Sequence, residues 1–223
     1  CAPCSASVLP QTGRGKLSAH VDLSSDAGRG TLRELTRGAD VFVQGYRPGA
    51  IAARGFAPEQ VAALRPGIVC VSLCAYGYDG PWQDRRGFDS LLQSVSGIAH
   101  EEGRAAGHDG PKHLPCQALD HATGYLAAFG AMVGLLRRSR EGGSWHVRVS
   151  LARTGHWIEN LGRIDGMSHP DLKRESIGDL IQVSDTPFGR LSHVAPAARL
   201  AETPPYWQLP SVPLGTHPSA WPA

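Results

Sequence analysis

The sequence has no long hydrophobic run and almost no net charge. No window approaches the roughly 18 consecutive apolar residues that a membrane-spanning helix needs, and the apolar stretch 126–136 ends in two arginines, as a buried helix does. The formal net charge of +2 is too small to indicate a nucleic-acid-binding surface. A basic start followed by an apolar core, the pattern of a secretory signal, is also missing. We therefore expect a cytoplasmic protein that binds neither nucleic acid nor membrane.

Cysteine is too scarce and too irregularly spaced for a disulfide framework or a zinc site. The five cysteines include a single C-x-x-C, formed by Cys1 and Cys4. A structural zinc site needs a second, closely spaced ligand pair, and the sequence has none. Three histidines gather in a polar loop, His100, His108 and His113, but no carboxylate accompanies them at ligand spacing. We therefore expect reduced thiols and no metal ion.

The sequence does contain the composition of a globular protein, with 41% hydrophobic and 19% charged residues. Residues 1–15 are rich in Pro, Gly and Ser and are expected to be disordered or to form a linker. From residue 16 the apolar pattern alternates between strands and helices. It predicts strands at 17–23, 40–45, 67–73 and 145–151, and helices at 30–37, 58–64, 88–98, 120–138 and 154–161, with a polar loop at 99–119.

A strand–helix–strand unit is the clearest part of this pattern. The run 67–73 is almost continuously apolar and rich in Val and Ile, as in a parallel strand that is buried on both faces. With the strand at 40–45 and the helix at 58–64 it makes a right-handed βαβ unit. After residue 162 the pattern weakens to a hairpin with arms at 180–184 and 190–194, and an irregular tail from 204. The fold class is therefore α/β.

One carboxylate, Asp120, stands where the polar loop gives way to the longest apolar helix, in ALDHATGYLAA (118–128). Asp is favoured at a helix N-terminus, so this position alone indicates a cap; the helix end would keep the carboxylate ionised and oriented. Four other blocks surround this run in a characteristic order. They are ADVFVQGYRPG (39–49), RPGIVCVSL (65–73), YGYDGPW (76–82) and GGSWHVRVSL (142–151).

In this order the blocks resemble the family III CoA-transferases (the CaiB/BaiF family), over residues 16 to about 161 and more loosely in the tail. The resemblance implies a Rossmann-like open parallel sheet and an acyl-CoA:carboxylate CoA-transferase that works through a mixed anhydride and an aspartyl-CoA thioester. Asp120 would be the acyl-accepting nucleophile, and coenzyme A would enter as the acyl-CoA substrate beside a carboxylic acid. Residues 16–162 would be the large-domain core, and 163–223 a reduced small-domain remnant and tail.

Five residues are candidates for binding coenzyme A. Gly45, Tyr46 and Arg47 follow a buried strand, at the edge of the sheet where open α/β folds bind ligands. Arg47 could clamp phosphates and Tyr46 could stack on adenine, although Pro and Gly also suit a plain surface turn. The resemblance adds two residues. Arg54 would correspond to a further arginine that family members carry after this loop. Lys16 lies in a run that resembles the family's Asn-Gly-Lys-Arg-Ser, although Leu17 replaces the second basic residue.

The resemblance also implies what the chain lacks and which alternatives stay open. The family's N-terminal βαβ unit and much of its small domain have no counterpart, which suggests a truncated member that forms a homodimer or pairs with a missing N-terminal half. One alternative is an α-methylacyl-CoA racemase, disfavoured because Phe88 replaces the catalytic His and cannot act as a base. Asp89 would then be a helix cap. The other alternative is a non-catalytic half-domain that binds CoA or a partner chain.

Overall fold

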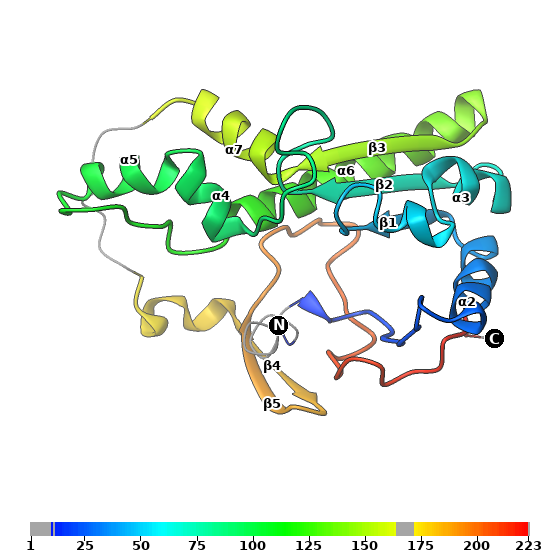
Figure 1. Cartoon of the computed structure of the whole chain (residues 1–223). Coiled ribbons are helices and arrows are strands. Elements are labelled where there is room, and N and C mark those ends of the chain that lie inside the picture. The colour runs from blue at the N-terminus through cyan, green and yellow to red at the C-terminus, as the bar shows by residue number, and fades with distance from the viewer. Residues whose placement is uncertain (1–9, 11, 164–171, 223) are drawn as a thin grey trace. The chain divides into compact units, whose positions relative to one another are not determined.

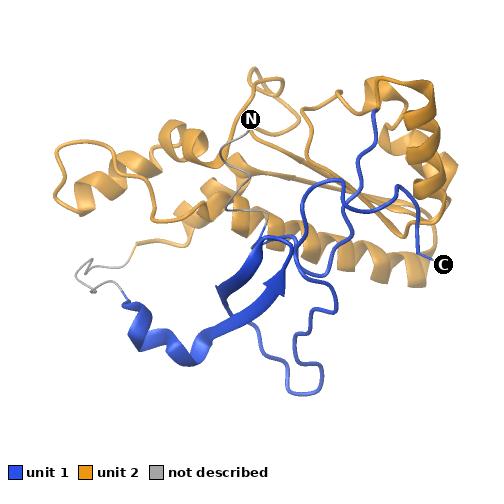
Figure 2. Cartoon of the chain, turned by 90° about the horizontal axis from the view of Figure 1, so that it is seen from below, with its two compact units in different colours: residues 1–22, 169–223 blue, residues 23–168 orange. Residues whose placement is uncertain are grey.

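The computed structural model describes residues 10, 12–163 and 172–222, which form two compact units. Unit 1 comprises residues 1–22 and 169–223, and unit 2 comprises residues 23–168 (Figure 2). Residues 16–22, assigned to the core by the sequence pattern, group with unit 1. Most of the expected disordered segment 1–15 lies outside the described residues. Among the described residues, no helix combines the length and the apolar character needed to cross a membrane.

A parallel three-stranded sheet forms the centre of unit 2, as the sequence predicts (Figure 1). Its strands are β1 (Val41–Gln44), β2 (Val69–Cys74) and β3 (Trp145–Ser150), in the order β1-β2-β3. The register aligns Val43, Val71 and Val147 on one face of the sheet. All but one of the β2 residues are buried, because this central strand is covered on both faces.

The described residues of unit 2 also form six α-helices. They are α2 (Asp26–Arg37), α3 (Pro58–Leu64), α4 (Asp89–Val95), α5 (Ile98–Ala105), α6 (Ala118–Glu141) and α7 (Leu151–Asn160), with a 3₁₀ turn, η1, at Ala52–Arg54. Helices α3, α6 and α7 contact the sheet. Serine side chains cap two of the six helices. The Oγ of Ser25 accepts a hydrogen bond from Gly28 N–H at the start of α2, and the Oγ of Ser150 accepts one from Arg153 N–H at the start of α7.

Helix α6 lies directly on one face of the sheet because two of its residues on that face are glycines. A Cβ atom added at Gly130 would lie 2.6 Å from Cγ1 of Val147, and one at Gly134 would lie 2.8 Å from Cγ1 of Val69. The opposite face is covered by η1 and α3, whose apolar cluster contains Ile51, Phe56, Val61, Ile68 and Cys70. These two layers cover both faces of the sheet.

Two details of the predicted pattern are wrong. Residues 17–23 form no strand, because their backbone pairs with the C-terminal tail instead: Ser18 N–H donates to Nδ1 of His217, and His217 N–H donates to the Ser18 carbonyl. The helix expected at 88–98 is broken at Gly97, whose φ of +93° is left-handed. A second helix, α5, then occupies the start of the expected polar loop.

Unit 1 contains the predicted hairpin. Its antiparallel strands are β4 (Ile181–Thr186) and β5 (Gly189–Val194), preceded by a 3₁₀ segment, η2 (Arg174–Leu180). Thr186 pairs with Gly189, so Pro187 and Phe188 form the turn. The described residues from 204 onward contain no helix or strand, as their proline content predicts.

Candidate functional site

A pocket of about 470 Å³ opens at the carboxyl ends of the three parallel strands. Its lining comes from the loop after β1, the loop after β2, the N-terminus of α6 and the first residue after β3. The lining includes Asp120 together with Gly45, Tyr46 and Arg47. The fold therefore brings the candidate nucleophile and three of the five candidate CoA-binding residues, about 75 positions apart in sequence, to one cavity.

Asp120 is the third residue of α6, and its side chain is exposed at the pocket. The preceding residue, Leu119, has no exposed surface and packs in a core cluster with Leu92, Ile98 and Leu151. Because neighbouring residues on a helix point in different directions, the burial of Leu119 fixes the start of α6 and leaves Asp120 facing outward. The apolar cluster is thus what orients the candidate nucleophile.

The pKa of the Asp120 carboxyl is raised above its usual value. The larger cause is desolvation by the protein around the carboxyl group, which disfavours the charged form although the side chain opens on the pocket, and the nearby carboxylate of Asp89 adds to it. The adjacent His121 acts in the opposite direction. The net direction is upward, so desolvation and Asp89 together outweigh His121. A carboxylate with a raised pKa is a more basic nucleophile.

Asp89 is a site residue that the sequence pattern assigned to another role. It begins α4 and is only 1% exposed. Its carboxylate does not cap α4: one oxygen accepts a hydrogen bond from Gln93, and the other accepts the backbone N–H of Asp120 at 2.8 Å. Asp89 therefore caps α6 across the tertiary structure. No local signal reveals this, because the two residues are 31 positions apart in sequence.

The Gly45–Arg47 loop is held by short local hydrogen bonds. The side-chain oxygen of Gln44, the last residue of β1, accepts Tyr46 N–H at 2.8 Å. The Arg47 carbonyl accepts Ala50 N–H at 3.0 Å, which closes the turn. Tyr46 is 57% exposed, so its ring is available to a ligand. These bonds shape the loop while leaving the Tyr46 and Arg47 side chains at the pocket.

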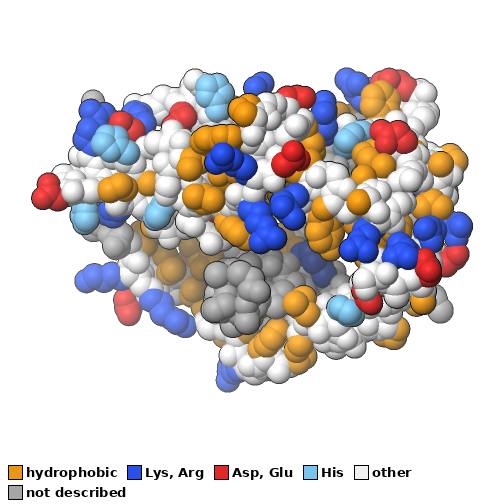
Figure 3. All heavy atoms as spheres, viewed as in Figure 1, with side chains coloured by type: hydrophobic (Ala, Val, Ile, Leu, Met, Phe, Trp, Pro, Cys, Tyr) orange, Lys and Arg blue, Asp and Glu red, His pale blue; other side chains and the backbone are white. Residues whose placement is uncertain are grey.

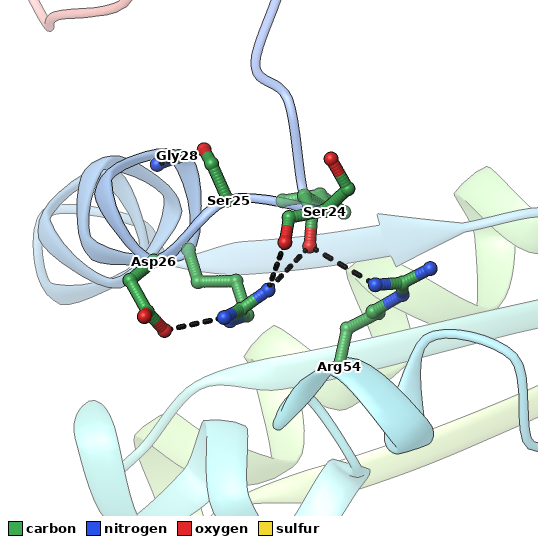
Figure 4. Close-up of polar contacts among 7 residues, drawn as sticks. Ser24, Ser25, Asp26, Gly28 and Arg54 are labelled. Carbon is green, nitrogen blue, oxygen red and sulfur yellow. Dashed lines mark hydrogen bonds and ion pairs between the residues drawn. The ribbon is translucent and has the colours of Figure 1, made fainter.

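The other two candidate CoA-binding residues do not line this pocket. Arg54 lies in η1 and donates a long hydrogen bond, 3.5 Å, to the carbonyl of Leu23 just before α2 (Figure 4). Arg29 also donates to this carbonyl. Lys16 belongs to unit 1, where its Nζ donates to the carbonyl of Thr12 at 2.5 Å.

Three further pocket residues were not proposed as ligands from the sequence: Arg85, Arg86 and Phe88. The guanidinium of Arg85 lies 5.0 Å above the ring of Trp82, a cation–π contact that holds this arginine on its loop. With Arg47, the lining contains three arginines against the single carboxylate of Asp120. Figure 3 shows Lys and Arg side chains in the middle of the face that it displays. Adjacent arginines before Gly87 were the only sequence signal for this charge.

The described residues contain no group of three or more His, Cys, Asp or Glu side chains placed to hold a metal ion. Of the three histidines in the polar region, His113 has partners of another kind: its Nε2 lies 2.9 Å from Oγ of Ser94 and 3.1 Å from the carbonyl of Ser90. The pocket can therefore be described by its arginines, aromatic rings and single carboxylate.

Sequence comparisons match the chain to known proteins. A family model described as CoA-transferase family III matches residues 4–207. Acetyl-coenzyme A transferase nodX of Hypoxylon pulicicidum is 32% identical over 165 residues, which cover 72% of this chain and 28% of that protein. Succinyl-CoA:glutarate CoA-transferase of Mus musculus is 35% identical over 130 residues, covering 58% of this chain and 29% of that protein. The chain thus spans less than a third of these two curated relatives.

Structural comparison finds the same fold among solved proteins. The crystal structure of a CAIB/BAIF family protein from Brucella suis matches with a TM-score of 0.64 at 23% identity, covering 82% of this chain and 49% of that chain. The orthorhombic crystal form of Rv3272 from M. tuberculosis matches with a TM-score of 0.59 at 29% identity, covering 67% of this chain and 42% of that chain.

Proposed function

The chain belongs to CoA-transferase family III, and from this premise we propose that it carries the site of an acyl-CoA:carboxylate CoA-transferase with Asp120 as the nucleophile. One observation supports this most strongly. Asp120 and the Gly45–Arg47 loop line the same pocket, at the carboxyl end of a parallel sheet. Ligands bind at this edge in open α/β folds.

The reaction needs a carboxylate but no separate base. The ionised carboxylate of Asp120 attacks the thioester carbonyl of acyl-CoA. The C–S bond breaks, the CoA thiolate departs, and a mixed anhydride forms between Asp120 and the acyl group. The thiolate then attacks the Asp120 carbonyl and releases the first carboxylate, giving an aspartyl-CoA thioester. An acceptor carboxylate displaces CoA from Asp120 in a second anhydride. Thiolate attack on the acyl carbon of this anhydride yields the new acyl-CoA and frees Asp120.

The pocket residues suit a negatively charged thioester substrate. Arg47 can bind phosphate through two parallel N–H donors, and the exposed ring of Tyr46 can stack on a base. Gly45 has no side chain to obstruct the close approach of a ligand to the loop. Arg85 and Arg86 add positive charge for phosphate or for the carboxylate of the second substrate. Lys16 and Arg54 stay predictions from the family resemblance.

Replacing Arg47 with alanine should weaken CoA binding by about ten- to a hundredfold, because a charge-assisted hydrogen bond contributes about 1.5–3 kcal/mol. Arg47→Lys should recover only part of this loss, because lysine keeps the charge but not the paired donors. Isothermal titration calorimetry with CoA measures both values. Arg37→Ala is the matched control, since Arg37 pairs with Glu34 on α2 and does not line the pocket. An Arg47→Ala variant that binds CoA like wild type would contradict the role.

The racemase alternative receives no support from the pocket. Phe88 lines the cavity and is 68% exposed. It stands where the resembling racemases carry their catalytic histidine, and a phenyl ring cannot take or give a proton. The α-carbon of a bound acyl group would therefore lack one of the two bases that inversion requires.

An apolar face of α6 is the surface through which we propose that the chain binds a partner. Tyr125, Phe129, Met132 and Leu136 are exposed at helical spacing along one side of this helix. Contiguous exposed apolar side chains are typical of an interaction surface. We infer that this face binds a second copy of the chain, giving a homodimer, or an N-terminal half like that of the family members, of which the chain spans less than a third in the two relatives above. A cytoplasmic location stays a prediction from the sequence.

The proposed mechanism is tested by chemical capture of its intermediate. The protein is mixed with acetyl-CoA or succinyl-CoA and treated with hydroxylamine, which converts an activated aspartyl ester into a hydroxamate. We expect mass spectrometry to find the hydroxamate on the peptide that contains Asp120. A protein that binds CoA but gives no hydroxamate would contradict the transferase mechanism and favour a binding module.

A further inference from the structure

A buried carboxylate holds the main chain at the candidate nucleophile. Asp120 is the third residue of α6, so its N–H has no acceptor within the helix. Asp89, on α4, supplies that acceptor at 2.8 Å. Asp89 is 1% exposed, so water hardly competes for this bond. The position of the Asp120 backbone is therefore set by a side chain from another helix.

Asp89 is itself fixed by a second buried side chain. Gln93, one turn further along α4, donates from Nε2 to the other oxygen of Asp89 and to the carbonyl of Cys116 at 3.2 Å. The amide oxygen of Gln93 accepts Leu114 N–H at 2.8 Å. Asp89 and Gln93 thus tie α4 to the loop that leads into α6. A buried network in which each of these groups has a partner is rigid.

A neutral side chain would be enough if capping were the only task. Ser25 and Ser150 cap α2 and α7 with hydroxyl groups. At α6 the side chain of the cap residue Gln117 accepts no hydrogen bond from the helix. The carboxylate of Asp89, on α4, accepts the Asp120 N–H in its place. Placing this charge beside a second carboxylate opposes folding through electrostatic repulsion. The arrangement is therefore costly for stability, but it affects the chemistry of Asp120 directly.

We propose that Asp89 is a positioning residue for acyl transfer: it anchors the backbone of Asp120 through the 2.8 Å hydrogen bond and, by its charge, keeps the Asp120 carboxylate strongly nucleophilic. The inference rests on the proposed role of Asp120 as nucleophile. It is supported by the direction of the Asp120 pKa, which the charge of Asp89 helps to raise.

The groups that face Asp120 determine how its titration responds. Asp89 of α4 raises its pKa, and His121 of α6 lowers it. The cationic pocket residues are Arg47, after β1, and Arg85 and Arg86, before α4. Removing the Asp89 charge leaves the other groups unchanged, so the titration midpoint of Asp120 must fall. The acid loss of activity then shifts to lower pH, because Asp120 stays ionised further into acid.

The test compares wild type with Asp89→Asn, and with Asp26→Asn as control. Asparagine has the shape of aspartate but carries no charge and accepts only one of the two N–H donors. Asp26 also begins a helix, α2, but its side chain is exposed and does not line the pocket. The first readout is the titration midpoint of the Asp120 carboxyl carbon, followed by ¹³C NMR. The second is the rate of hydroxamate formation at Asp120 with saturating acetyl-CoA.

For Asp89→Asn we expect a lower titration midpoint and hydroxamate formation slowed about tenfold, because small displacements of a nucleophile are costly. CoA affinity should stay within about twofold of wild type. Asp26→Asn should change none of these. An unchanged midpoint and rate in Asp89→Asn would overturn the proposal. If Asp89→Asn lowers the titration midpoint of Asp120 but wild type forms no hydroxamate, the effect of Asp89 on Asp120 holds and the transferase mechanism is refuted.

Wild type offers a test that does not depend on the folding of a variant. If Asp89 accepts the Asp120 N–H in solution, that amide should exchange with deuterium at least about tenfold more slowly than an open-chain amide. Exchange at the open-chain rate would show that the bond is not maintained, and the positioning role would be wrong.

Discussion

Asp120→Ala should reduce acyl transfer by about a thousandfold or more, because the variant has no carboxylate to form the anhydride. CoA affinity should change by less than about threefold, since phosphate and adenine are bound by other residues. Initial rates of CoA transfer measure the first effect, and calorimetric titration with CoA measures the second. The separation of the two effects distinguishes a nucleophile from a residue that merely binds the substrate.

Two further variants make this result specific. Asp120→Asn keeps the size of the side chain and should be as inactive as the alanine variant, because a carboxamide does not form the anhydride. Asp109→Ala removes an exposed aspartate from the loop before α6 and should transfer at the wild-type rate. Residual transfer above about a tenth of wild type in either Asp120 variant would show that another group is the nucleophile.

Gly134→Ala should lower the free energy of unfolding by about 1–3 kcal/mol, although alanine is the better helix former. The new methyl group would lie 2.8 Å from Cγ1 and 3.2 Å from Cγ2 of Val69 on the central strand, so rotation of the valine cannot relieve both contacts. Helix α6 must therefore move away from the sheet. Urea denaturation followed by circular dichroism measures the change.

The matched control is Gly124→Ala on the same helix. A Cβ atom at Gly124 meets no atom within 4 Å, so only the gain in helix propensity remains. This variant should be more stable than wild type by about 0.5–1 kcal/mol. If both variants shifted stability in the same direction, the close packing of α6 on β2 would not be what limits position 134.

Most of the helices and strands could be predicted from the local sequence pattern. The helix predicted at 58–64 has those same bounds in the structure, because Pro58 marks its first turn and its apolar spacing is regular. The apolar run 67–73 contains most of β2, the buried central strand, which begins two residues later and ends one residue later. The strand predicted at 17–23 was wrong, since alternation alone does not provide a neighbouring strand.

The site could be predicted only in part. The sequence proposed Asp120 and the Gly45–Arg47 loop because each lies at the end of a regular element and belongs to a recognisable block, and the structure places them in one pocket. Arg54 was proposed only from the resemblance, as a counterpart of a further family arginine; in the structure it contacts the main chain before α2 and does not line the pocket. A side chain a few residues along a turn can point in any direction, and periodicity does not determine which.

The sequence by itself determined the α/β alternation and the position of one carboxylate at the start of a long helix, because these depend on neighbours within a few residues. The parallel βαβ unit followed from the order of the elements and the general rule for strand–helix–strand connections. Only the tertiary structure decided that Asp89 binds the backbone of Asp120, and that Arg85 and Arg86 share a pocket with Arg47. These relations join residues about 30 to 40 positions apart, whose distance in space depends on how the helices pack against the sheet.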